Sequence, residues 1–402
     1  MQSNLTETKN SSTAAAAVAV GDYLIKIQDA LGRAKRIADE AKTEAAETDS
    51  IDKFPTETMR QIADAGLLSA PLPREFGGLG LGLENETSLE ILTLLKHFGR
   101  GNLVVGRIYE GHYNALLLLK LFGTKEQFQR YAREIVKENK LFGVWNTEGS
   151  DGVKILPCGS GKYELKGAKI FASGVDYVER PFVNGTLPDG GWQMCVVPFE
   201  KVSAQTDKSW WQPIGMKATR SFRVDFTGIE LDENDLIGKA NDYYGQPWFT
   251  GGAIRFAAVQ LGAAEAIYEE TIDYLRRLKR TEDSFQRMRL GEMAIAVGSG
   301  NLWLKNAAEK LDEYQLARND DTSEKFLVRS KMMRTAIVEI CEKVMNLCAR
   351  SIGARGLNKP FHFERIIRDL TIYLRQPAPD AALADVGRCV LELPNADFRQ
   401  PF

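Results

Sequence analysis

Hydrophobic residues recur at helical spacing through the first third of the chain. Between residues 22 and 140, apolar side chains return every three or four positions, as at Leu24, Ile27, Leu31 and Ala34. This period places them on one face of an amphipathic helix. We therefore predict a helical N-terminal domain over residues 22–140, preceded by a flexible tail over residues 1–21.

The pattern changes between residues 141 and 240. Short runs rich in Val, Phe, Trp and Thr are separated by Gly and Pro, and apolar positions alternate with charged ones, as at Tyr163 and Leu165. Alternation with a period of two is typical of half-buried strands. This part is predicted to form a small middle β-domain.

Helical spacing returns over residues 241–402. Two long apolar faces are visible, the first through Phe256, Val259, Ala263 and Ala266 and the second through Met333, Ile337, Ile340 and Val344. Such faces predict the helices of a C-terminal four-helix bundle. The predicted fold class is therefore α+β, with a helical N-terminal domain, a small middle β-domain and a C-terminal helical bundle.

Composition narrows the classes of function. The chain has 52 Lys and Arg against 54 Asp and Glu, so no net field favours nucleic acid. The five cysteines lack metal-ligand spacing, which predicts no metal site and fits a reduced cytoplasmic compartment. The apolar run at residues 13–20 is short for a signal peptide, and no run reaches the roughly 20 residues of a membrane span. We expect a cytoplasmic protein that acts on a small molecule.

Five motifs give the chain a family resemblance. They are residues 73–80 (PREFGGLG), 142–151 (FGVWNTEGSD), 165–174 (LKGAKIFASG), 350–357 (RSIGARGL) and 366–377 (IIRDLTIYLRQP). Their content and order resemble those of the acyl-CoA dehydrogenase superfamily over nearly the whole chain. The resemblance implies a flavoprotein that binds FAD rather than FMN.

The same resemblance implies which residues contact the flavin. The element at the entry to the β-domain lines the flavin in the family, and here it contains Trp145, Asn146 and Thr147. A strand then supplies an aromatic ring for the flavin face and a hydroxyl for its polar edge, which correspond to Phe171 and Ser173.

A glycine-rich turn in the bundle of family members reaches the flavin diphosphate of a neighbouring subunit. The matching candidates are Arg350, Gly353 and Ala354, since glycines allow close backbone approach and Arg can clamp a pyrophosphate. This arrangement implies a homotetramer, or at least a homodimer. Ser150 is the implied contact to the substrate, with an acyl-CoA thioester as one candidate.

The catalytic carboxylate of the family has no match in this chain. Where many members have Glu-Gly-Thr, the sequence reads Pro377-Ala378-Pro379, and the alternative Glu position falls near residues 252–254, which are not acidic. Proton abstraction beside a thioester needs a positioned base. The catalytic candidates are Asp380, as the nearest carboxylate, Arg255, as a ligand or carboxylate contact, and His112.

Three hypotheses about function remain open at this point. The first, slightly preferred, is an FAD-dependent dehydrogenase-like oxidoreductase that acts on the CH–CH group of an acyl thioester or similar substrate. The second is a flavin-dependent monooxygenase of the same fold, because such enzymes also lack Glu-Gly-Thr and some use a His on an N-terminal helix, where His112 is found. The third is an inactive flavin-binding scaffold. The electron acceptor, or a reductase partner, is left open by all three.

Overall fold

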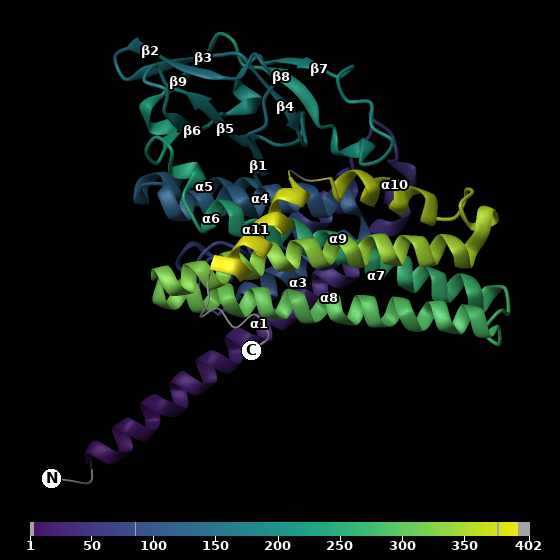
Figure 1. Ribbon diagram of the computed structural model, residues 1–402. Helices are drawn as coiled ribbons and strands as arrows, with labels where there is room; N and C mark the ends of the chain where they lie inside the picture. The colour runs from purple at the N-terminus through teal and green to yellow at the C-terminus, as the bar shows by residue number, and fades with distance from the viewer. Residues whose placement is uncertain (1–3, 85, 376–377, 393–402) are drawn as a thin grey trace.

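The fold was analysed in a computed structural model that describes residues 4–84, 86–375 and 378–392. Figure 1 shows two regions, a β-domain above and an assembly of helices below. The N-terminal helices are α1 (Asn4–Glu47), α2 (Thr56–Asp64), α3 (Ser88–Gly101), α4 (Leu103–Phe122) and α5 (Lys125–Glu138). No helix within these described ranges is long and apolar enough to cross a membrane.

Local sequence signals explain where several helices begin and end. The Asn102 side chain accepts a hydrogen bond from the Val104 N–H at 3.0 Å and starts α4. A capping box between Thr124 and Gln127 starts α5, and Asn139 ends it in the left-handed conformation. These polar side chains satisfy backbone groups that the helix itself leaves unpaired.

The β-domain contains two sheets. Its strands are β1 (Phe142–Trp145), β2 (Lys154–Gly159), β3 (Lys162–Lys166), β4 (Ala168–Ala172), β5 (Arg180–Thr186), β6 (Trp192–Val196), β7 (Gln205–Asp207), β8 (Phe222–Asp225), β9 (Ile229–Asp232) and β10 (Leu236–Ile237). The larger sheet has the order β10-β6-β5-β2-β3-β9, with β1 parallel to β5, and the smaller has the order β4-β8-β7. The alternation predicted for this region is confirmed in β8 and β9, where buried and less buried residues alternate.

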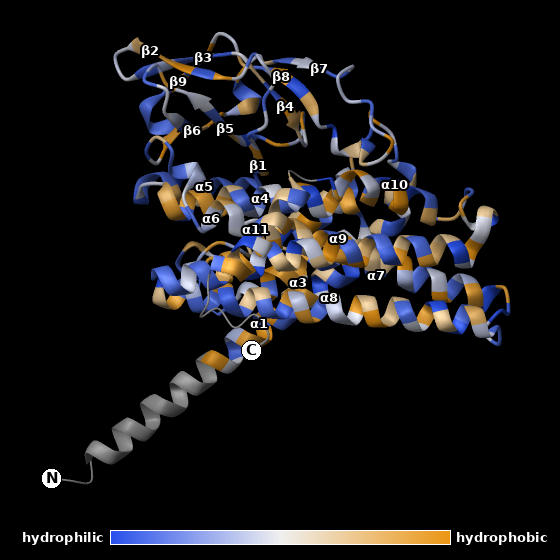
Figure 2. Ribbon diagram, viewed as in Figure 1, coloured by the Kyte–Doolittle hydropathy of each residue, from blue (hydrophilic) through white to orange (hydrophobic). Residues whose placement is uncertain are grey.

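The C-terminal part is helical. Its helices are α6 (Trp248–Gly251), α7 (Ala253–Arg277), α8 (Ser284–Ala317), α9 (Asp320–Gly356), α10 (Phe363–Tyr373) and α11 (Pro379–Glu392). Figure 2 shows hydrophobic residues gathered where α7 packs against α3 and α9 in the middle of the helical region. The predicted α+β class, with its helical, sheet and helical regions in that order, is confirmed.

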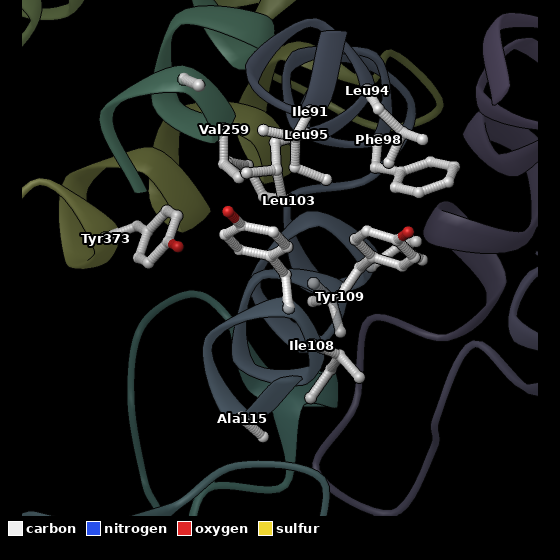
Figure 3. Close-up of a cluster of buried hydrophobic side chains, with 14 of the residues drawn as sticks. Ile91, Leu94, Leu95, Phe98, Leu103, Ile108, Tyr109, Ala115, Val259 and Tyr373 are labelled. Atoms are coloured by element: carbon white, nitrogen blue, oxygen red, sulfur yellow. The ribbon is translucent and has the colours of Figure 1, made fainter. Parts of the chain in front are cut away.

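Glycines bring α3, α4 and α7 into close contact. A Cβ added at Gly99 of α3 would collide with the Val259 carbonyl of α7, and one added at Gly262 would collide with the Lys96 carbonyl of α3. A Cβ at Gly106 of α4 would come within 2.6 Å of the Val259 side chain. Figure 3 shows Val259 among the buried side chains of α3 and α4. Helix α3 therefore contacts both α4 and α7 through its backbone, as only glycine permits.

This crossing makes a prediction about stability. Gly99→Ala should lower the free energy of unfolding by about 1–3 kcal/mol, because the new methyl group meets a backbone carbonyl that moves only if the helices separate. Urea denaturation followed by circular dichroism would measure the change. Gly32→Ala in α1 is the matched control, since its Cβ would meet only ordinary contact at 3.7 Å and Ala favours a helix interior. Equal stability of the two variants would contradict the close crossing.

Candidate active site

Two adjoining cavities lie between the β-domain and the helices. The smaller has a volume of about 380 Å³ and the larger about 680 Å³, both within the range of small-molecule sites. They share six lining residues, and these residues mark where one cavity opens toward the other: Glu110, Asn114, Val144, Tyr243, Phe249 and Phe256. Helix α4, strand β1 and the start of α7 thus form a common wall.

The β-domain side of the smaller cavity is lined by Asn146, Thr147, Phe171 and Ser173. A buried lysine fixes the first two, because the Lys169 ammonium donates to the Asn146 carbonyl at 3.0 Å and pairs with Glu148 at 2.6 Å. Sequence alone placed Asn146, Thr147, Phe171 and Ser173 together, and the structure brings all four to one cavity.

Phe171 has an unusual backbone conformation. Its φ is +54°, and the pairing of β4 with β8 is irregular between Lys169 and Ala172. Positive φ is unfavourable for a bulky residue and is found most often where a function requires it. The ring, 46% exposed, lies edge-on to Trp210 at 4.8 Å between centroids. The bulge thereby turns an aromatic ring toward the cavity instead of into the β-domain core.

Three hydroxyls form a hydrogen-bonded chain along the same wall. Thr219 Oγ1 donates to the Met216 carbonyl at 2.8 Å, which commits its only proton. It must therefore accept the proton of Ser221 Oγ at 2.7 Å, and Ser221 in turn accepts from Ser173 Oγ at 2.8 Å. With its own proton used in this way, Ser173 presents lone pairs to the cavity and can accept a hydrogen bond from a ligand N–H.

Helix α10 forms the opposite side of the smaller cavity. Asp369 accepts a hydrogen bond from the Met216 N–H at 2.5 Å, which joins α10 to the β-domain. Four residues later, Tyr373 lines the cavity, and its buried hydroxyl has no hydrogen-bond partner among the described residues. Burial raises its pKa well above the ordinary value. A buried polar group of this kind usually has a partner, so the cavity could hold a flat ligand with a polar edge.

A polar network lies where the two cavities meet. Arg107 pairs with the buried carboxylate of Glu110 at 2.9 Å, and Glu110 also accepts a hydrogen bond from Asn114. The Asn114 carbonyl oxygen accepts from Arg255 Nε at 2.5 Å. Glu110 was not predicted from the sequence, although it is the one acidic residue of α4, which was a signal for it. Among the described residues, it is the carboxylate that lines both cavities.

The larger cavity is mainly apolar. Its walls include Leu117, Leu118, Leu121, Trp248, Phe249, Ala253, Phe256, Ala381 and Ala382. Charged side chains also reach it from α7, α9 and α11: Arg255, Lys331, Arg334 and Asp385. Lys331 and Asp385 form an ion pair that joins α9 to α11. Helix α11 therefore covers this cavity.

The other predicted residues lie elsewhere. Trp145 is buried in the β-domain and donates from Nε1 to the Ser173 carbonyl at 2.8 Å, so it supports the wall from behind. Ser150 and Asp380 are exposed and line neither cavity. Ala378 lines the larger cavity, whereas Gln376 and Pro377 are outside the described residues.

The turn at the end of α9 is separate from both cavities of the described chain. Its predicted cofactor residues are all exposed: Arg350, Gly353 and Ala354. A role toward the flavin of a neighbouring subunit stays a prediction for them.

Comparison with known proteins identifies the family. The acyl-CoA dehydrogenase N-terminal domain matches residues 29–139, and the acyl-CoA dehydrogenase C-terminal domain matches residues 254–375. The chain belongs to the acyl-CoA dehydrogenase superfamily. The family resemblance of the five motifs is thus confirmed.

Several known proteins are similar to this chain over most of its length. Dibenzothiophene monooxygenase of Rhodococcus erythropolis is 24% identical over 395 residues, which are 90% of this chain and 93% of that protein. The 3-(aryl)acrylate reductase of Clostridium sporogenes is 26% identical over 341 residues, or 82% and 88%. FMN-bound TdsC from Paenibacillus sp. A11-2 has a TM-score of 0.82 at 21% identity, covering 90% of this chain and 97% of its own. The chain is an oxidoreductase of the acyl-CoA dehydrogenase-like fold.

His112 is a buried link between α4 and the β-domain of this superfamily member. Its Nε2 lies 2.9 Å from the Leu68 carbonyl, and its Nδ1 accepts from the Phe142 N–H at 3.1 Å. Only a neutral ring can donate through one nitrogen and accept through the other, and burial lowers its pKa to about 4. The ring lines neither cavity.

The neutral His112 predicts an acid-sensitive fold. In the unfolded chain the ring takes up a proton near its ordinary pKa of 6.5, whereas in the folded chain its pKa is about 4. The free energy of unfolding therefore falls as the pH drops from about 6.5 to about 4. Relative to His112→Gln, the wild type should lose up to about 3 kcal/mol of unfolding free energy between pH 7 and pH 4. Urea titrations at several pH values would measure this difference. Parallel pH curves would contradict this account, because the ring would then take up its proton at the same pH in the folded and the unfolded chain.

Proposed function

We propose that this protein is a flavin-dependent monooxygenase that inserts one oxygen atom into an aromatic substrate. The observation that carries the proposal is the pair of adjoining cavities, one suited to a flat cofactor and the other mainly apolar, combined with the position of Asp380. This nearest substitute for the family's base is exposed and outside both cavities. Dehydrogenation needs a carboxylate over the substrate. Glu110 lines both cavities, but its carboxylate is already paired with Arg107 at 2.9 Å.

The comparisons support the same choice. Several similar proteins are monooxygenases, including the Rhodococcus enzyme and, at the level of the fold, TdsC. This reverses the order of the two hypotheses drawn from the sequence, in which dehydrogenase-like chemistry stood slightly first. Motifs common to both branches could not separate them.

We propose FMN as the cofactor in place of the FAD expected from the sequence. TdsC binds FMN, and FMN has no diphosphate for the turn at residues 350–357 to bind. In that turn Ala354 stands where family members have a second glycine, and its Cβ narrows the approach of the backbone to a diphosphate. Both facts favour the shorter cofactor.

The residues of the smaller cavity fit a flavin ring. Thr147, Ser173 and the Tyr373 hydroxyl would meet its polar edge, and Phe171 and Phe256 would contact its aromatic faces. Reduced flavin would supply the two electrons that convert one oxygen atom of O₂ to water while the other enters the substrate. The chain itself would orient the substrate through Asn114 and Arg255 and exclude water with the apolar walls. A separate reductase would be needed to supply the reduced flavin.

A second function has specific support from Glu110. Its buried carboxylate lines both cavities, where it could act as a base in dehydrogenation or as an acid in the reverse reaction. The acrylate reductase among the similar proteins is consistent with this alternative. In that case Glu110→Gln should abolish anaerobic bleaching of the flavin by an acyl thioester.

We also propose that the protein forms a homotetramer or homodimer through α8. Met288, Ile295 and Leu302 follow one another at intervals of seven residues and are 52%, 73% and 61% exposed. A stripe of this kind is typical of a surface that another helix covers. Ile295→Glu should therefore give a smaller species in analytical ultracentrifugation, whereas Leu391→Glu on α11 should not.

The monooxygenase proposal predicts the fate of labelled oxygen. With FMN, NADH, a flavin reductase and an indole or dibenzothiophene probe, the wild type should incorporate one ¹⁸O atom from ¹⁸O₂, detected by mass spectrometry. Ala382→Trp fills the larger cavity and should lower product formation at least tenfold, while reduced flavin is still oxidised. Leu383→Trp, on the exposed side of α11, is the matched control. Anaerobic bleaching by a thioester, without ¹⁸O incorporation, would contradict the proposal.

A further inference from the structure

Arg255 places a positive charge in the wall of the larger cavity. It lies in the first turn of α7 and lines this cavity, and its Nε donates to the neutral Asn114 side chain at 2.5 Å. Its guanidinium carbon is 5.8 Å from the centre of the Tyr113 ring. Within the described ranges, no carboxylate oxygen lies within 4.0 Å of its nitrogens.

Most N–H donors of Arg255 have no acceptor within the described parts of the chain. A guanidinium has five N–H donors, and the one at Nε is used by Asn114. The remaining four, on the two Nη atoms, make no hydrogen bond within the described parts of the chain. These four donors form the planar fork that matches a carboxylate or a related oxyanion.

Gly252 allows the guanidinium to lie against the start of α7. A Cβ at this position would come within 2.5 Å of Arg255 Nη2, so any other residue would displace the fork. Helix α6 runs into α7 through Gly252, and the Arg255 N–H donates to the Gly252 carbonyl at 3.1 Å. The positive charge at this place therefore comes from the guanidinium.

The other charges around the cavity do not neutralise Arg255. Glu110 is paired with Arg107 at 2.9 Å, and Asp385 is paired with Lys331. Arg334 adds another cation to the lining and lies 5.4 Å from the Phe256 ring centre. The cavity thus contains three cationic side chains and two carboxylates, each of which already has a cationic partner. A partly buried charge in an apolar wall is costly unless a counter-ion compensates it.

The other residues that line the larger cavity indicate the shape and polarity of the rest of the ligand. Aromatic and leucine side chains surround the space, namely Leu117, Leu118, Leu121, Tyr243, Trp248, Phe249 and Phe256. They suit a flat apolar body, and the volume of about 680 Å³ is ample for a two-ring molecule.

We propose that the substrate is an aromatic anion, whose carboxylate or sulfinate group binds Arg255 while its rings occupy the apolar part of the larger cavity. The inference rests on the proposed function only in treating this cavity as the substrate site. Binding of the anion needs neither flavin nor oxygen.

A matched pair of probes tests the charge preference. Isothermal titration of the purified full-length protein with 2-naphthoate and with 2-naphthamide compares the same rings with and without a charge. The wild type should bind the naphthoate at least about tenfold more tightly. Naphthalene-2-sulfinate, as a third probe, shows which of the two head groups fits better. Equal affinities for the acids and the amide would overturn the proposal.

Variants then assign the preference to Arg255. Arg255→Gln should bring the acid-to-amide affinity ratio close to one without weakening amide binding, and Arg255→Lys should keep part of the ratio because the charge remains. Arg276→Gln is the control, since this arginine is exposed on the same helix and pairs with Asp273 at 3.5 Å. An unchanged ratio in Arg255→Gln would overturn the assignment. Thermal melts of each variant check that the fold is intact.

The two proposals fail in different ways. If the protein does not incorporate oxygen but still prefers the naphthoate, the proposed reaction is wrong and the anion site stands. If it oxygenates neutral probes and shows no preference for the acid, the reaction stands and the anion site is wrong.

Discussion

The close crossing of α3, α4 and α7 is the constraint on which the candidate active site depends. Glycines at 99, 106 and 262 let the backbone of α3 contact α4 and α7 and leave room for Val259 between them. Glu110 and Asn114 follow Gly106 by about one and two turns of α4, and Arg255 precedes Val259 by about one turn of α7. The distance between the helices therefore sets the 2.5 Å hydrogen bond between Asn114 and Arg255, and with it the place where the two cavities join.

The β-domain forms the other side of the site, where hydrogen bonds and a bulge, instead of helix packing, position the side chains. A buried Lys169 holds the turn after β1, a bulge in β4 turns Phe171 outward, and the hydroxyl chain orients Ser173. Asp369 then joins α10 to this wall through the Met216 N–H. The smaller cavity is thus bounded by polar groups whose donor and acceptor roles are fixed by the fold, whereas the larger one is bounded mainly by apolar helical faces.

Much of this organisation was readable in the sequence, and the rest was not for physical reasons. The spacing of hydrophobic residues along the chain predicted the three regions, because buried positions recur every three to four residues in helices and every two in strands. The motifs at Thr147, Phe171 and Ser173 pointed to residues that share a cavity, since each lies within a short local segment.

Glu110 and the exposed position of Asp380 were not predictable in the same way. Periodicity gives the face of a helix but not the rotation of that helix against its neighbours, and that rotation decides which polar residue enters a cavity. Asp380 was proposed from its distance along the chain to Pro377, whereas its exposure depends on how α11 packs on α9. The choice between FAD and FMN likewise depends on contacts that no local motif determines.

The central claim is that the smaller cavity binds the cofactor and the larger cavity binds the substrate. A crystal structure of the complex with FMN would test this claim most directly. We predict electron density for the isoalloxazine ring in the smaller cavity, with Ser173 Oγ and the Tyr373 hydroxyl each within about 3.2 Å of a polar ring atom and the larger cavity left open beside it. A flavin ring bound in the larger cavity, or density only outside both, would contradict this account.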